Sequence, residues 1–210
     1  MLLVIPAMNS CSKTGDENAQ PQTVENSDYS AIEKDGLVLS DEEAILFMRE
    51  EEKLALDVYL YLFDKWEHVV FDNISKSEQR HMDEVLALIV HFGLEDPALG
   101  IGEFTDPVLQ QMYDDLTSMV DTSLEDAMVV GATIEDLDIW DLETFIEEAE
   151  DELVQCVFGN LMRGSRNHLR AFVRHLDMLD VTYTPQYISQ EEFDAIINGP
   201  HEPHGTPCEF

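Results

Sequence analysis

Four long segments with helical periodicity are the feature that most constrains the fold of this chain. Apolar residues recur every three or four positions in about 40–66, about 73–92, a segment that begins after residue 123, and about 151–180. Such spacing puts the apolar side chains on one face of a helix, which must then be buried against another element. We find no alternation typical of strands, so the sequence predicts an all-α protein.

Local signals mark where these helices start and stop. Ser40 is followed three residues later by Glu43, the spacing of a capping box, and Gly93 suits the end of the second helix. A break near residues 140–141 is expected within the third helix. Short helices are expected near 108–119 and 190–197.

The order of the segments predicts their arrangement. Two helices follow each other closely, and residues 93–122, rich in Pro and Gly, then make a long connection to a second pair. A ferritin-like four-helix bundle with one long crossover connection has this order. We therefore expect the bundle over residues 40–182 and an extended C-terminal tail with a short helix over 183–210.

Residues 1–39 read as a leader and a disordered linker. The short apolar run 2–8 followed by Cys11 is similar to the end of a bacterial lipoprotein signal, although no basic residue precedes it. If Cys11 carries a lipid anchor, the protein belongs to the cell envelope or periplasm. Otherwise the segment is an unstructured tail and the protein is cytoplasmic.

The charge balance excludes one class of partner. The chain has 45 acidic and 11 basic residues and a formal net charge of −34, which argues against binding nucleic acid or an anionic membrane. It is compatible with cation handling, but a salty habitat would explain it equally well. Three cysteines without a Cys-x-x-Cys pair do not predict a disulfide framework.

Polar residues interrupt the apolar face of each long helix. In the first, Glu52 falls within the stripe, Glu51 at its edge and Glu50 on the far side. In the second, Glu78 and His81 share the inward face because they are one turn apart.

The second pair of helices shows the same pattern. Glu135 and Asp138 lie on the inward side of the third helix, and His168 lies on that of the fourth. Arginines line the opposite face of the fourth helix and are expected to meet acidic groups. They are Arg163, Arg166, Arg170 and Arg174.

Buried carboxylates on several helices require compensation. An isolated ionised carboxylate in an apolar core costs several kcal/mol, so it must be paired, protonated or bound to metal. Two divalent cations would neutralise these groups, and oxygen and imidazole ligands suit iron or manganese and tolerate zinc. Taken singly, each carboxylate could instead reach water at the edge of its stripe, and His168 and Tyr59 could be ordinary core residues.

These residues resemble those of a known family. Glu52-x-x-Ala55-x-x-x-Tyr59, Glu78-x-x-His81 and Glu135-x-x-Asp138 are similar to the first three helices of rubrerythrin-type ferritin-like proteins. More broadly, residues 40–197 resemble an uncharacterised prokaryotic ferritin-like family. The stretches that carry this resemblance are residues 50–55, 77–82 and 163–170.

The resemblance implies a di-iron carboxylate site. Glu52 and His81 would serve one metal and His168 the other, with Glu78 and Glu135 as bridges. The chain departs from the pattern at Ser165, where a glutamate is expected, so the second metal position lacks one carboxylate. The implied metal ligands are Glu52, Glu78, His81, Glu135, Asp138 and His168.

Three functions remain open from the sequence. The first is an oxidoreductase, ferroxidase- or peroxidase-like, that acts on Fe(II), peroxide or O2 with an external electron donor, because no rubredoxin-like cysteines are present. The second is a metal-binding or storage module without catalysis, and the third a metal-free helical interaction domain. An oligomer is compatible with each. The tail 201–208 offers a loose ligand set, or is simply disordered.

Overall fold

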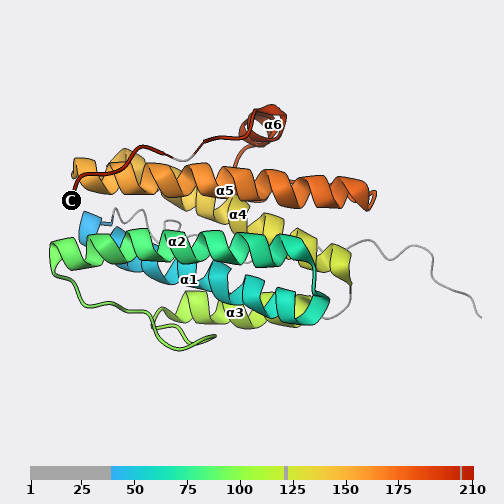
Figure 1. Cartoon of the computed structure of the whole chain (residues 1–210), viewed down its shortest axis with the longest axis horizontal. Coiled ribbons are helices and arrows are strands. Elements are labelled where there is room, and N and C mark those ends of the chain that lie inside the picture. Colours follow the sequence, from blue (N-terminus) through green and yellow to red (C-terminus); the bar gives the residue numbers. More distant parts are fainter. Residues whose placement is uncertain (1–38, 121–122, 204) are drawn as a thin grey trace, which may run out of the picture.

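The structure, a computed structural model, describes residues 39–120, 123–203 and 205–210, which form helices and no strands (Figure 1). None of these helices is both long and apolar enough to cross a membrane. The six helices are α1 (Asp41–Trp66), α2 (Val69–Phe92), α3 (Pro107–Met119), α4 (Leu124–Glu148), α5 (Glu152–Met178) and α6 (Gln190–Asn198).

The expected helix ends are present at α1 and α2. Ser40 and Glu43 form a capping box at the start of α1, with the Ser40 amide 2.9 Å from Oε2 of Glu43. Gly93 ends α2 in the left-handed region at φ 68°, where glycine has no steric penalty. Helix α2 starts earlier than expected, at Val69, because the side chain of His68 accepts from the amide of Val70.

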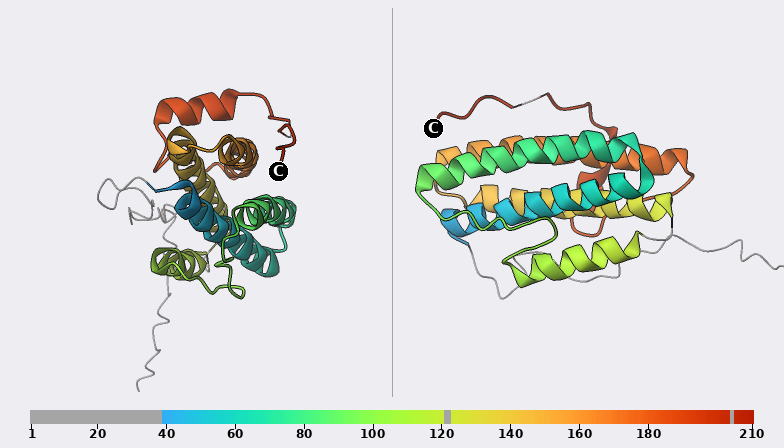
Figure 2. Two further views of the ribbon diagram at one scale, coloured as in Figure 1. Left: turned by 90° about the vertical axis from the view of Figure 1, so that its left-hand side faces the viewer. Right: turned by 60° about the horizontal axis from the view of Figure 1, so that its bottom comes forward.

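The four long helices lie side by side (Figure 2). Helix α1 packs along α2 and α4 along α5, and the two pairs meet through contacts between α1 and α4 and between α2 and α5. Helix α3 packs outside this group against α1 and α4, and α6 packs against α5. Every long helix therefore presents one face to a shared interior.

Helix α4 is continuous, so the expected break near residues 140–141 is wrong. No Pro or Gly occurs between Ala132 and Glu148. Asp141 is fully buried within the helix rather than turned to solvent at a helix end, and Leu142 continues the apolar face. An acidic residue on the apolar face of a helix does not end that helix when neighbouring elements bury its side chain.

The connection between α2 and α3 is held by the far side of α1. Both carboxylate oxygens of Glu50 accept hydrogen bonds from Thr105, and Oε2 also accepts from the Asp106 amide at 3.1 Å. Asp57 accepts from the Gly102 amide at 2.9 Å. Glu50 is consequently buried, contrary to expectation, because the connection covers a face that the helix alone leaves exposed.

The C-terminal segment runs back along α5 after α6 (Figure 1). Glu202 forms ion pairs with Arg166 at 2.6 Å and with Arg170 at 2.9 Å, which accounts for two of the arginines on this face. A disulfide joins Cys156 of α5 to Cys208. The segment is thus fixed by both charge and a covalent bond.

Loss of this disulfide should loosen the segment measurably. The bond spans 52 residues, and a loop of that length is worth about 2–4 kcal/mol in the free energy of unfolding. We expect Cys11→Ser/Cys208→Ser to be less stable than Cys11→Ser by this amount in urea unfolding. The difference should vanish in the presence of a dithiol reductant, and a difference that persists there would assign the effect to something other than the disulfide.

Candidate metal centre

Five of the polar residues expected to face inward meet between the four long helices. Helix α1 supplies Glu52, α2 supplies Glu78 and His81, α4 supplies Glu135, and α5 supplies His168. They form two groups of three, Glu52–Glu78–His81 and Glu78–Glu135–His168, each with one donor atom per residue within 4.8 Å of the others. Glu78 belongs to both groups and therefore joins them.

The first group is built around one imidazole nitrogen. Nδ1 of His81 lies 2.8 Å from Oε2 of Glu78 and 3.1 Å from Oε2 of Glu52. Glu78 and His81 are three residues apart on α2, so both project from the same face toward Glu52 on the adjacent helix.

The second group repeats this arrangement on the other side of Glu78. Nδ1 of His168 lies 2.8 Å from Oε1 of Glu78 and 3.4 Å from Oε2 of Glu135. The two imidazole rings are nearly parallel, with 5.5 Å between their centroids and 25° between their planes. The two carboxylate oxygens of Glu78 thus face different histidines.

Burial and missing hydrogen bonds fit a metal site. All five residues are less than a tenth exposed, and neither group contains Lys or Arg. Within the described residues, Oε1 of Glu52 is buried and has no hydrogen-bond partner. Buried polar atoms are rarely left unpaired, so converging donors of this kind suit a bound cation.

Charge coupling between the groups is strong. Burial alone would raise the pKa of Glu78, but the imidazoles of His168 and His81 outweigh it and hold this pKa well below its usual range. Burial lowers the pKa of His168, yet the carboxylates of Glu78 and Glu135 together raise it to about 10. The histidines therefore act as cations that substitute for a metal charge in the metal-free protein.

The outer carboxylates behave differently from Glu78. Burial raises the pKa of Glu52 to about 7, although the His81 charge opposes the shift. Burial also raises the pKa of Glu135, against the charge of His168. Three carboxyl groups thus face only two imidazoles, and a bound cation would favour the ionised form of Glu52 and Glu135.

Tyr59 forms a direct hydrogen bond with one residue of this centre. Its hydroxyl donates to Oε1 of Glu135 at 2.5 Å and lies 3.3 Å from the carbonyl oxygen of Gly131. The residue is fully buried in the core, so it is both a packing residue and the donor that orients Glu135.

Removal of the Tyr59 hydroxyl should weaken the fold. In Tyr59→Phe a buried carboxylate oxygen of Glu135 loses its donor, so we expect the free energy of unfolding of the metal-free protein to fall by about 1–3 kcal/mol. Urea unfolding measures this. Tyr113→Phe is the matched control, because within the described residues that hydroxyl donates to no group, and equal stabilities of the two variants would refute the assigned role.

Asp138 lies beside the centre but belongs to neither group of three. It is buried, and Oδ1 has no hydrogen-bond partner within the described residues. Burial, with the charges of Glu52 and Glu135, raises its pKa well above the usual range, while a hydrogen bond from Ser165 partly opposes this. Ser165, the residue where the resemblance led us to expect a glutamate, is also buried and contacts Asp138.

Two further acids extend the polar interior. Glu51, expected at the edge of the stripe, is only 2% exposed, and Asp141 is fully buried. Burial, followed by the charges of Asp141 and Asp138, raises the pKa of Glu51 well above its usual range. The sequence offers weak signals for both burials. Glu51 is next to Glu52, and Asp141 follows Asp138 by three residues on the same face of α4.

A glycine makes room for one of the histidines. A Cβ atom at Gly164 of α5 would overlap Nε2 of His81 and lie 2.5 Å from its Cε1. The imidazole of His81 therefore occupies the space that any side chain at residue 164 would need. By contrast, a Cβ atom at Gly159 on the same helix would meet nothing within 4 Å.

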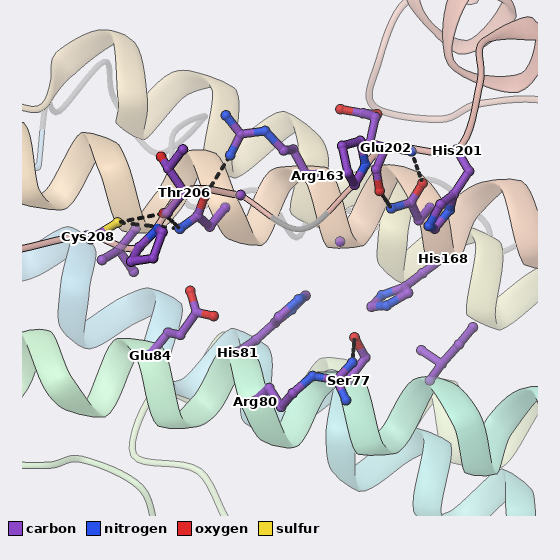
Figure 3. Close-up of a pocket in the computed structure, with 18 of the residues that line it drawn as sticks. Ser77, Arg80, His81, Glu84, Arg163, His168, His201, Glu202, Thr206 and Cys208 are labelled. Carbon is purple, nitrogen blue, oxygen red and sulfur yellow. Dashed lines mark hydrogen bonds between the residues drawn. The ribbon is translucent and has the colours of Figure 1, made fainter.

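A cavity of about 670 Å³ opens onto the centre between α2, α5 and the C-terminal segment. In Figure 3, His81 rises from α2 and His168 descends from α5 into the same gap. His201 and Thr206 of the C-terminal segment also line this cavity. The histidine edges of the centre are thus the part that a molecule in the cavity can reach.

These features define an all-helical protein with buried Glu–His groups that could hold a metal ion. The chain belongs to the DUF2202 family, described as an uncharacterized protein domain, whose model matches residues 41–200. All the residues of the centre lie within this match.

A relative agrees with this chain in sequence and fold. The chain is 47% identical over 175 residues to the uncharacterized protein MJ0754 of Methanocaldococcus jannaschii, a match that covers 82% of this chain and 95% of that protein. The crystal structure of hypothetical protein MJ0754 is similar with a TM-score of 0.76 and 48% identity, and covers 79% of this chain and 97% of that one.

Proposed function

We propose that residues 40–182 form a ferritin-like four-helix bundle that holds two metal ions, with iron as the preferred metal, and that the protein is an oxidoreductase. The observation that carries the proposal is the pair of Glu–His groups joined by Glu78. Each group offers two carboxylates and one imidazole, a donor set that suits iron or manganese.

The contacts support the following assignment of residues, in which Glu135 serves one metal instead of bridging two. Glu52 and His81 would hold one metal and Glu135 and His168 the other, with Glu78 between them, since its two oxygens face different histidines. Asp138 would complete the second position, where Ser165 cannot act as a carboxylate ligand.

The surrounding residues supply what such a site needs. A pair of iron ions, when bound, supplies one-electron redox chemistry. Tyr59 orients Glu135, and burial keeps the carboxylates away from solvent. The cavity gives a small molecule access to the histidine side of the centre.

Addition of Fe(II) under air tests the redox part of this proposal. We expect a near-ultraviolet absorption band of oxidised iron and consumption of O2 or peroxide that exceeds that of Fe(II) in buffer. Stoichiometric metal binding without any such turnover would refute the oxidoreductase and leave a metal-binding or storage module. Unchanged absorption together with no bound iron would refute both.

A further inference from the structure

The C-terminal segment covers one side of the cavity at the centre. Helices α2 and α5 form the other walls, and the lining residues of the segment are 201–203, 205–208 and 210 (Figure 3). Its end reaches α2, where the ring of Phe210 lies 6.1 Å from that of His91. The segment therefore bridges α5 and α2 on the outside of the cavity.

The two ends of this cover lie beside different histidines. An amide near its start donates to the side chain of Asn167 at 2.9 Å, one residue before His168. Farther along, a Cβ atom at Gly205 would lie 2.7 Å from Nη1 of Arg163, which precedes the glycine that packs against His81. Although both histidines line the cavity, they are only 6% and 8% exposed. Residues 205–210 are thus the part of the cover that lies at the level of His81.

Two attachments of different chemistry hold the cover to α5. Near its start, Glu202 forms ion pairs with Arg166 and Arg170. Near its end, Cys208 forms the disulfide with Cys156. The ion pairs do not depend on redox conditions, so a reductant would release only the second attachment.

Few other contacts hold the end of the cover. The described residues 200–203 and 205–210 form neither helix nor strand, so no regular ladder of backbone hydrogen bonds fixes them. Asn160 of α5 donates to the Thr206 carbonyl oxygen at 3.1 Å and to Sγ of Cys208 at 3.4 Å. A hydrogen bond that water can replace contributes little to stability. Without the disulfide, residues 205–210 would therefore depend on one side chain and on the contact of Phe210.

The disulfide is within reach of a thiol reagent. Cys156 and Cys208 are both partly exposed, and Cys208 lines the cavity (Figure 3). A thiolate can attack one sulfur to form a mixed disulfide, and the second thiol of a dithiol then completes the reduction. The S–S bond breaks and two thiols form, while the dithiol supplies two electrons and two protons and becomes a disulfide itself.

We propose that the disulfide between Cys156 and Cys208 is a redox latch that controls access to the centre. In the oxidised protein, residues 205–210 close the cavity beside His81. In the reduced protein, these residues swing away about the attachment at Glu202, and the cavity opens. The partner is a dithiol, and the inference goes beyond the proposed function because the latch acts on the chain with or without metal.

A neutral nitroxide in solution tests the latch on the metal-free protein. It is larger than water and suits a cavity lined by two arginines and two glutamates. We compare the NMR line broadening of histidine ring protons in Cys11→Ser and in Cys11→Ser/Cys208→Ser. Broadening at His81 should be at least about threefold stronger in the second protein, because loss of an attachment worth a single hydrogen bond shifts local opening by about that factor.

Other histidines provide internal controls. His168 should respond less than His81, because the attachment at Glu202 remains beside it. His68 and His175 lie outside the cavity lining, so their broadening should be equal in the two proteins and shows that both are folded. Cys11→Ser that has been reduced with a dithiol and desalted under argon should match Cys11→Ser/Cys208→Ser.

The outcomes separate the latch from the function proposed for the centre. Equal broadening at His81 in the oxidised, reduced and double-variant proteins would overturn the latch and leave the disulfide as a structural cross-link. Stronger broadening in a chain that takes up no metal would support the latch and refute the metal centre. In metal-loaded protein, a chelator should remove the ions at least about threefold faster after reduction, and equal rates would contradict control of access.

Discussion

Glu78→Ala is expected to abolish tight binding at both metal positions. Oε2 of Glu78 faces His81 and Oε1 faces His168, so one substitution removes a donor from each group. Loss of partners that merely orient a ligand costs about 10–100-fold in metal affinity, and loss of a shared ligand should exceed about 100-fold. Metal per chain after loading and desalting, with affinity from competition against a chelator, measures the effect.

Glu147→Ala is the matched control for this variant. Glu147 is an exposed residue in the last turn of α4, and the same substitution there should leave two metals bound with wild-type affinity. Glu78→Gln keeps the size of the side chain, so its metal loss would be due to charge and not to a cavity. If Glu78→Ala holds two ions as tightly as wild type, the assigned ligand set is wrong.

Gly164→Ala is expected to have the second largest effect, although residue 164 binds nothing itself. The added methyl group would overlap the imidazole of His81 and force the ring away from Glu52 and Glu78. We expect at least about tenfold weaker binding at the first metal position and a loss of about 1–3 kcal/mol in stability from overpacking. Metal titration and urea unfolding measure the two effects separately.

Gly159→Ala provides a control on the same helix. The methyl group there meets nothing within 4 Å, and alanine is the better helix former by about 1 kcal/mol. This variant should therefore be slightly more stable than wild type and bind metal normally. Equal metal affinities for the Gly159 and Gly164 variants would show that His81 does not need the space next to α5.

Helical periodicity predicted the inward residues well but not everything that is buried. It separated Glu52 from its neighbours, and Glu52 does contact His81. It placed Glu50 in solvent because periodicity describes one helix at a time. The connection before α3 covers Glu50, and only the tertiary structure shows which face a long connection crosses.

Asp138 shows a second limit of face analysis. Its position on α4 is one turn after Glu135, as expected, yet it lies outside both groups of three. An aspartate side chain is one methylene shorter than glutamate, so sharing a face does not ensure the same reach. Sequence spacing does not encode the distances that keep Asp138 out of both groups.

The C-terminal segment was the least predictable part. The pairing of Cys156 with Cys208 joins residues 52 positions apart, and spacing alone does not specify such a pairing. The role of Gly164 is equally hidden, because it depends on a histidine from another helix. The arginine face of α5 was the one signal, since four cations on one helix of an acidic chain predict acidic partners.

The metal content of the purified protein tests the central claim most directly. After anaerobic loading with Fe(II) and desalting, elemental analysis should give two ions per chain. The melting temperature should rise with free metal, since a ligand at 100 times its Kd stabilises the native state by about 2.7 kcal/mol. Less than one ion per chain, with an unchanged melting temperature in excess Fe(II), manganese or zinc, would contradict a metal centre.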